Sequence, residues 1–280
     1  MKSKFVCVIF LILVFKTVVY SQADTIVKKK EGSFKIGVFY NSYLNYYGRT
    51  DSLQSSGVFP LAELWLNNKF YISAAPVFVN NATQNMEYAG TVATAGYYTK
   101  SKNEKFAIHT WFTKPFYEPG TQLVQSALKA QANTGFSWLN KYININAGGD
   151  VKLSDKLDYG LTAGLDHLFG NKFEKEWQLF VIPSAYMNAG TQHFATTYYK
   201  KNSFLFFSGI EQQVTEEVSK LNILSYEFSM PIVLAKNKLQ IILNPAYVIP
   251  QNLVTVEGRP DLSESGKEMF YATVGAKITF

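Results

Sequence analysis

The feature that most constrains this chain is the length of its alternating segments. Apolar residues recur at every second position over stretches of roughly 10–13 residues, and turn residues separate the stretches. Within one stretch, Ile143 and Ile145 share one face, while Asn144 and Asn146 share the other. Period-two alternation predicts a β-strand with one apolar and one polar face. Twelve such segments lie near 33–44, 57–66, 69–79, 86–99, 105–117, 130–139, 142–152, 157–168, 177–188, 222–234, 238–249 and 269–280.

These segments are longer than the strands of soluble sheets, which average five or six residues. A strand that rises about 3.3 Å per residue and tilts by about 40° covers roughly 25–30 Å over 10–13 residues. That distance matches the hydrocarbon layer of a bilayer, where an unpaired sheet edge cannot exist. We therefore expect an all-β fold, a closed antiparallel up-and-down transmembrane β-barrel of about 12 strands. Barrels of 10 or 14 strands are the alternatives.

The connections alternate in length, as they do in transmembrane barrels with short inner turns and long outer loops. Two connections fit this pattern less well, a tight outer loop at 154–156 and a long inner turn at 169–176. The short connections are 67–68, 140–141 and 235–237, and the long ones are 45–56, 118–129, 189–221 and 250–268.

Aromatic residues gather near the segment ends, which is typical of interfacial girdles. The pattern predicts a girdle that includes Tyr46 and Tyr47, Phe70 and Tyr71, Tyr97 and Tyr98, Phe116 and Tyr117, Trp138 and Tyr142, and Tyr198 and Tyr199.

The N-terminus has the pattern of a secretory signal peptide. A basic start (residues 1–4) precedes the apolar run FVCVIFLILVF at 5–15, which is too short for a spanning helix. We expect cleavage between Ser21 and Gln22. The predicted organisation is therefore a signal peptide at 1–21, a flexible lead-in at 22–32 and a barrel at 33–280.

The cysteine content argues against a lipid anchor and a disulfide, and the charge argues against nucleic-acid binding. Cys7, the only cysteine, lies inside the apolar run, so the mature chain has no thiol for a lipid anchor or a disulfide. Removal of residues 1–21 lowers the formal charge from +6 to +3. Because no basic stripe remains, nucleic acid is not an expected partner.

The last eleven residues, FYATVGAKITF, alternate strictly and end on an aromatic side chain. Together with the signal peptide and the long strands, this ending resembles the Gram-negative outer-membrane β-barrel proteins. The residues that carry the resemblance are Phe270, Val274, Ile278 and Phe280. It implies that the chain resides in the outer membrane among its lipids and that the barrel assembly machinery reads the terminal strand. The Tyr- and Asn-rich composition further resembles small barrels from the Bacteroidota.

Catalytic and metal motifs are not found in the sequence. None of the three histidines lies in the His-x-Ser pattern of the outer-membrane phospholipases. Asp166 and His167 are adjacent, so on a strand they face opposite sides and cannot form the dyad of the outer-membrane proteases. Glu211, Glu216 and Glu217 are interpreted as a solvated loop or short helix. We therefore predict no enzymatic activity, no metal site and no cofactor.

Charged residues on the predicted inner face are the candidates for function. A wet lumen tolerates them, and they set the selectivity of a pore. We expect a narrow channel or a solute-binding barrel for small molecules. The alternatives are a non-conducting barrel that docks an envelope protein through its outer loops and, less favoured, a barrel lipase or protease. The lumen candidates are Lys35, Glu63, His109, Asp150, Asp166, Glu227 and Lys277.

Overall fold

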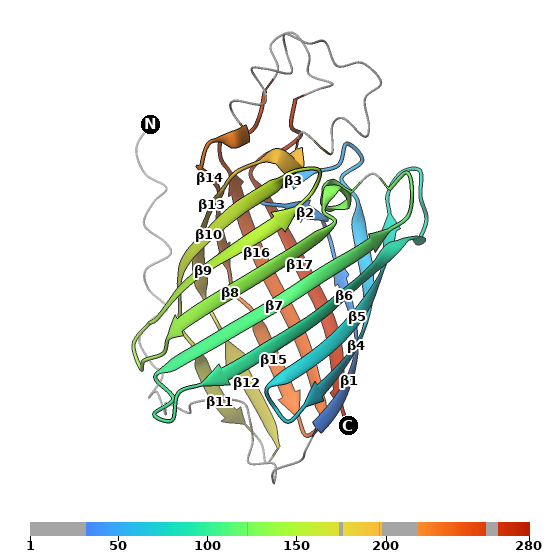
Figure 1. Ribbon diagram of the computed structural model, residues 1–280. Helices are drawn as coiled ribbons and strands as arrows, with labels where there is room; N and C mark the ends of the chain where they lie inside the picture. The colour runs from blue at the N-terminus through green and yellow to red at the C-terminus, as the bar shows by residue number, and fades with distance from the viewer. Residues whose placement is uncertain (1–31, 122, 174–175, 196, 198–217, 256–262) are drawn as a thin grey trace, which may run out of the picture.

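The computed structural model describes residues 32–280, except for 122, 174–175, 196, 198–217 and 256–262. These residues form a closed antiparallel barrel with long strands tilted across its axis (Figure 1). The predicted signal peptide, its cleavage after Ser21 and the lead-in up to residue 31 lie outside the described residues, as do Glu211, Glu216, Glu217, Tyr198 and Tyr199.

The strands follow one another around the barrel in chain order. We call a strand, or two consecutive strands, that fills one position around the wall a stave. The first seven staves are β1 (Gly32–Asn41), β4 (Ser56–Leu66), β5 (Phe70–Asn80), β6 (Glu87–Lys100), β7 (Phe106–Tyr117), β8 (Ala130–Trp138) and β9 (Asn144–Leu153). The remaining strands are β10 (Leu157–Asp166), β11 (Phe169–Phe173), β12 (Trp177–Val181), β13 (Ser184–Gly190), β14 (Asn222–Ser229), β15 (Ile232–Lys236), β16 (Leu239–Pro250) and β17 (Met269–Thr279). Two short strands, β2 (Asn45–Tyr46) and β3 (Arg49–Thr50), and the 3-10 helix η1 (Val124–Ala127) lie in the outer connections.

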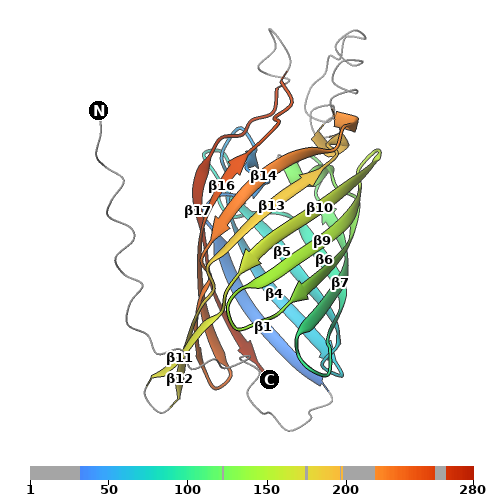
Figure 2. The ribbon, with the colours of Figure 1, turned by 90° about the vertical axis from the view of Figure 1, so that its left-hand side faces the viewer.

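Three pairs of these strands each act as one stave. β10 continues into β11, β12 into β13, and β14 into β15, because each pair meets the same neighbours in one register. The barrel therefore has twelve staves, as the sequence predicts. The long inner turn expected at 169–176 is largely strand, since β11 and β12 form a hairpin at the inner end, where β12 also pairs with β15 (Figure 2).

Proline residues mark the level at which these staves are interrupted. Pro183 separates β12 from β13, and Pro231 separates β14 from β15. Pro245 stands in β16 at the same level, because Ser229 pairs with Ala246 and Ile232 with Leu243. Proline has no N–H to give to the ladder, so a row of missing donors crosses three neighbouring staves.

The first and last staves close the barrel. β1 pairs antiparallel with β17 from Lys35 opposite Thr279 to Asn41 opposite Thr273. The Phe280 N–H donates to the Phe34 carbonyl oxygen at 2.7 Å, which extends the ladder to the last residue. We call the end at which β1 starts and the chain stops the inner end, and the opposite end, with the long loops, the outer end.

The outward face is apolar, and a belt of aromatic side chains surrounds the barrel at each end of it, which fits an outer-membrane location. These two belts are called the inner and the outer aromatic ring. Aliphatic residues such as Ile72, Leu161 and Val274 are about half exposed between these rings. Among the described residues, no helix is long and apolar enough to span a bilayer. The inner ring contains Phe34, Phe70, Phe106, Trp138, Tyr142, Phe173 and Phe280, and the outer ring contains Tyr40, Tyr43, Tyr88, Phe116 and Tyr159.

Several residues that the sequence assigns to the girdle lie inside the barrel instead. Tyr46 and Tyr47 belong to the first outer loop and pack against buried side chains at the outer end. Tyr71 and Tyr117 are inward residues of their strands, because each follows a lipid-facing Phe by one position. Nearness to a segment end does not tell the inner face from the outer one, so this part of the girdle prediction is wrong.

Inward aromatic rings lie across glycines of the neighbouring stave. A Cβ atom at Gly96 would clash with Tyr71, one at Gly164 with Tyr186, and one at Gly275 with Phe39. The glycines therefore leave room for the rings to lie against the wall and narrow the lumen without filling it.

Substitution of a lipid-facing residue by arginine tests whether the outward face of the barrel contacts hydrocarbon. Leu161 lies in the middle of β10 and is 54% exposed. Leu161→Arg should lower the free energy of unfolding in vesicles by about 2–4 kcal/mol, because the cation meets hydrocarbon. Leu161→Ala is the control and should cost clearly less. Equal losses in urea titrations of the two variants would contradict a lipid-facing position.

Candidate functional site

All seven sequence-predicted lumen residues lie on the inner face of the barrel. Directly paired residues on neighbouring strands share a face. Lys35 pairs with Glu63, Asp150 with Asn133, and Glu227 with Tyr186. His109 pairs with Gly135, Asp166 with Asn144, and Lys277 with Gly37. Only His109 and Asp150 of the seven line the main cavity described below.

A chain of contacts runs along the wall formed by β1, β4, β5 and β7. The Lys35 ammonium lies 3.3 Å from a Glu63 carboxylate oxygen. The Trp65 indole N–H donates to that same oxygen at 2.6 Å, and the Trp65 ring stacks on Tyr71. The Tyr71 hydroxyl and His109 Nε2 share a hydrogen bond of 2.9 Å. His109 in turn stacks on Trp111 with ring centres 4.4 Å apart, so the wall presents a fixed row of rings.

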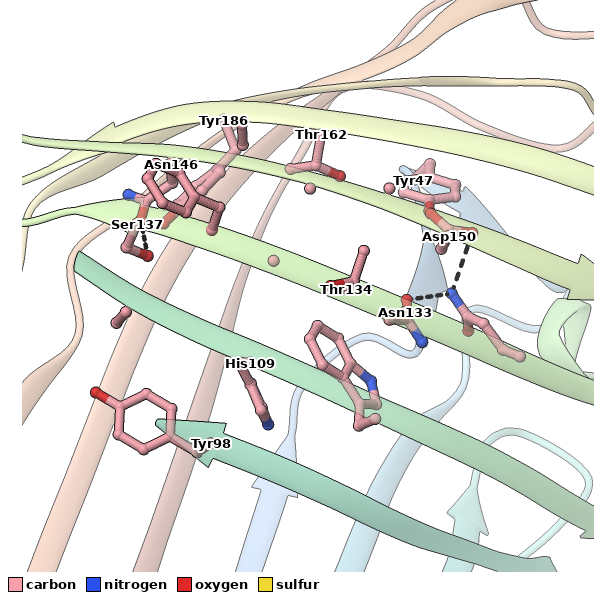
Figure 3. Close-up of a pocket in the computed structure, with 18 residues that line it drawn as sticks. Tyr47, Tyr98, His109, Asn133, Thr134, Ser137, Asn146, Asp150, Thr162 and Tyr186 are labelled. Atoms are coloured by element: carbon pink, nitrogen blue, oxygen red, sulfur yellow. Dashed lines mark hydrogen bonds between the residues drawn. The ribbon is translucent and has the colours of Figure 1, made fainter. Parts of the chain in front are cut away.

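A cavity of about 340 Å³ lies beside this row, inside the barrel. Figure 3 shows its side chains projecting from β6, β7, β8, β9, β10 and β13, with Tyr47 entering from the first outer loop. Its lining combines aromatic rings with amides and hydroxyls. The polar and aromatic lining residues are Tyr47, Tyr98, His109, Trp111, Gln131, Asn133, Thr134, Ser137, Asn146, Asp150, Thr162 and Tyr186.

The charged group of the cavity is neutralised by its own neighbour. The Asp150 carboxylate forms an ion pair with the fully buried Lys152 ammonium. The Gln131 amide donates to Asn133 Oδ1 at 3.0 Å and to Asp150 at 3.4 Å (Figure 3). The Asn133 Nδ2 group is buried and has no hydrogen-bond partner among the described residues. A buried donor without an acceptor is costly, so this group favours a solute oxygen in the cavity.

Asp166 lies nearer the inner end and is held by amides. Asn144 and Asn146 donate to its two oxygens at 2.6 and 2.5 Å, and the Tyr186 hydroxyl donates at 3.3 Å. Glu227 accepts a hydrogen bond from the side chain of Tyr271. Both carboxylates are therefore hydrogen-bonded to side chains of other strands.

The first outer loop (residues 42–55) folds into the outer end of the barrel. Its β2–β3 hairpin lies above the cavity, and Leu44 packs against the inward side chains of Val77 and Val79. On the other side, Tyr46 packs edge-on against Phe194, which is fully buried. The outer end thus holds two apolar clusters.

Arg49 fixes this hairpin to the opposite wall. Its side chain is 1% exposed, and its Nε donates to Glu264 at 2.9 Å. It also donates to Gln192 and to the backbone carbonyl oxygens of Leu224 and Gln251. Burial raises the pKa of the Glu264 carboxyl, and the Arg49 guanidinium opposes that shift. One cation therefore ties the first outer loop to three later parts of the chain.

The sequence predicts two of the residues that line the cavity, His109 and Asp150, but not most of the others. Gln131, Asn133 and Asn146 are ordinary polar positions of alternating strands, and no spacing distinguishes them. Tyr47 and Arg49 lie in a loop whose fold depends on distant residues, such as Glu264, 215 positions after Arg49. The alternation around Trp111 does place it on the same face as His109, and this was the one signal available.

Comparisons with known proteins give a likeness of fold. No protein-family model matches the chain, and no curated protein sequence matches it. Among solved structures, a KdgM porin is 11% identical at a TM-score of 0.45, with 88% of this chain and 99% of that one covered. LpxR from Salmonella typhimurium is 11% identical at a TM-score of 0.45, with 89% and 100% covered. A NanC porin is 10% identical at a TM-score of 0.42, with 88% and 98% covered. The likeness reaches no further than the barrel architecture, and the resemblance to Bacteroidota barrels stays a prediction.

Loss of the Arg49 side chain should loosen the outer end. Arg49→Ala leaves Glu264 buried without its cation, which should lower the free energy of local opening by about 3–5 kcal/mol. The measurement is the rate of protease cleavage within residues 42–55 of the folded barrel. Lys129→Ala is the matched control, because its ion pair with Asp155 at the same end is more than half exposed and should contribute little. Equal cleavage rates in the two variants would contradict the role of Arg49.

Proposed function

We propose that this chain is an outer-membrane barrel that binds one small, neutral, hydroxyl-rich solute in its lumen, as a narrow channel or a solute-binding barrel. The observation that carries the proposal is the 340 Å³ cavity lined by aromatic rings and amides. The proposed role of the cavity is to bind a solute and not to catalyse a reaction.

The size and the charge of the cavity favour such a solute. Ligand pockets of proteins occupy about 300–1,000 Å³, so this one suits a single small molecule. Its carboxylate is already paired with Lys152, which leaves little net charge for an ionic solute. The amides of Gln131, Asn133 and Asn146 offer donors and acceptors at fixed positions, and the Asn133 donor has no partner in the described part of the chain. Hydroxyl groups satisfy both kinds of site.

The outer loop favours a narrow passage over an open pore. Tyr47 lines the cavity, and its hairpin is held by Arg49, so the cavity is bounded on its outer side. A twelve-strand barrel is intermediate between filled eight-strand barrels and the open porins. A solute therefore meets this hairpin when it moves between the cavity and the outer end.

Tryptophan fluorescence tests the binding site. Neutral mono- and disaccharides should change the emission of Trp111, which lines the cavity, when they are titrated into the folded barrel. Trp111→Phe should remove most of the change. Trp138→Phe is the control, because Trp138 faces lipid and is 44% exposed, and this variant should keep the change.

Other results would overturn the proposal. A fluorescence response that survives in Trp111→Phe would place binding outside this cavity. In planar bilayers, the same sugars should reduce the ion current through the barrel if it conducts. A barrel that neither conducts nor binds any small solute would instead support the predicted docking barrel.

We also propose that the terminal strand is read by the barrel assembly machinery. Phe280 pairs with Phe34 through two backbone hydrogen bonds, yet half of its side chain is exposed. Deletion of Phe280 should lower the yield in the outer membrane while leaving refolding of the purified chain in detergent nearly unchanged. Unchanged yield in cells would contradict this role. The envelope partner expected at the outer loops stays a prediction, since 198–217 and 256–262 lie outside the described residues.

A further inference from the structure

A second constellation of reactive side chains lies at the outer end, away from the lumen cavity. His193 follows β13, and its Nδ1 lies 2.9 Å from Oδ1 of Asp158, which lies near the start of β10. Its other ring nitrogen, Nε2, lies 3.1 Å from the Ser219 hydroxyl oxygen. The carboxylate is fully buried, the imidazole side chain is 15% exposed, and Ser219 is exposed. The order carboxylate, imidazole, hydroxyl is that of a serine hydrolase triad.

The Asp158 carboxylate binds both the backbone and the ring of His193. The carboxylate accepts the backbone N–H groups of His193 at 2.7 Å and Phe194 at 2.8 Å. The Thr191 hydroxyl donates to the same carboxylate at 2.7 Å. With the ring and the main chain of His193 bound to one buried anion, Nδ1 carries the proton and Nε2 points outward as an acceptor. A structural helix cap requires the backbone bonds alone, and it does not require an exposed serine on the second nitrogen.

We propose that Asp158, His193 and Ser219 form a hydrolytic site that cleaves an ester-linked acyl chain from an amphiphile in the outer leaflet. In the first step, Ser219 Oγ attacks the ester carbonyl carbon, and His193 Nε2 takes the hydroxyl proton. His193 then gives this proton to the departing alcohol oxygen, which leaves an acyl group on Ser219. Water attacks that acyl group, again through Nε2, and releases the fatty acid and the free serine. Asp158 is a positioning residue that stabilises the imidazolium.

The surroundings of the triad indicate the substrate class. Leu157 and Tyr159 flank Asp158 in sequence and face lipid from the opposite side of β10, with 48% and 55% of their surface exposed. Leu221, two residues after Ser219, is 57% exposed. The exposed hydroxyl therefore lies at the rim of the barrel next to Leu221, level with the outer aromatic ring on the lipid side of the wall, where acyl chains meet their ester linkages. Lys156 and Lys220 are exposed at the same end and suit an anionic headgroup.

The sequence gives no direct sign of this site. Asp158 and His193 are 35 positions apart, and Ser219 follows His193 by 26. The expectation that the chain has no catalytic function rests on short motifs and on adjacent pairs, and the fold joins residues from three strand ends.

Labelling with a fluorophosphonate, which phosphonylates activated serines, tests the proposal on the full mature chain folded in detergent. Ser219 should be the labelled residue by peptide mass spectrometry. Ser219→Ala should remove the label, and His193→Gln should slow labelling by about a hundredfold or more, the usual contribution of a general base. Asp158→Asn, which keeps an acceptor for the backbone N–H groups, should also slow it. Ser56→Ala is the control, since Ser56 is another outer-end serine whose hydroxyl donates to the Asn80 carbonyl oxygen, and it should label as the parent does.

The folded state of each variant is checked by its heat-dependent gel mobility. No label on Ser219 in the folded barrel would overturn the proposal, as would equal labelling rates in His193→Gln and the parent. Hydrolysis of p-nitrophenyl esters should be faster with long acyl chains than with acetate. The reverse order would exclude the lipid substrate. None of these outcomes depends on the lumen cavity, so failure here leaves the proposed solute site standing.

Discussion

The rest of this structure depends on the closure of one hydrogen-bond ladder. A sheet in hydrocarbon cannot leave N–H and C=O groups unpaired, and β1 meets β17 over seven paired positions to remove the last edge. Closure turns one face of the sheet toward lipid and encloses the other face, so it also determines which side chains line the lumen. Every polar group of the lumen, from the Lys35–Glu63 pair to the Asp150–Lys152 pair, is tolerated because the ladder separates it from lipid.

Within that frame the two ends of the barrel are built differently. The outer end contains buried apolar clusters and the Arg49 network, which resemble the core of a soluble protein. Among the described residues, the middle and the inner end hold no such core, and aromatic rings lie there across glycines, such as Tyr186 over Gly164. The lumen is consequently narrow at the outer end and lined by ordered side chains below it. A cavity with fixed aromatic and amide groups follows from this arrangement.

Much of the barrel could be predicted from the sequence because strand alternation is a local property. The alternation in residues 142–152 determines the face of each residue without knowledge of the partner strand, and so it placed Asp150 inside. The closure of the first strand on the last also followed, since no edge is permitted. By contrast, the loop positions Tyr46, Tyr47 and Arg49 take their places from contacts with Phe194, Gln192 and Glu264. These contacts are made by distant residues with no periodic pattern, and the same reason hid the pairing of His193 with Asp158.

The row of Pro183, Pro231 and Pro245 has a mechanical consequence. Each proline removes one donor from the ladder, because it has no N–H. Its carbonyl oxygen still accepts a hydrogen bond, from His167 to Pro183, from Ile182 to Pro231 and from Met230 to Pro245. Below this level β12 stays paired with β15, while β11 pairs only with β12 among the described residues (Figure 2). The wall is therefore thinned in hydrogen bonds at one level without being cut, and the β11–β12 hairpin is held to it along one side.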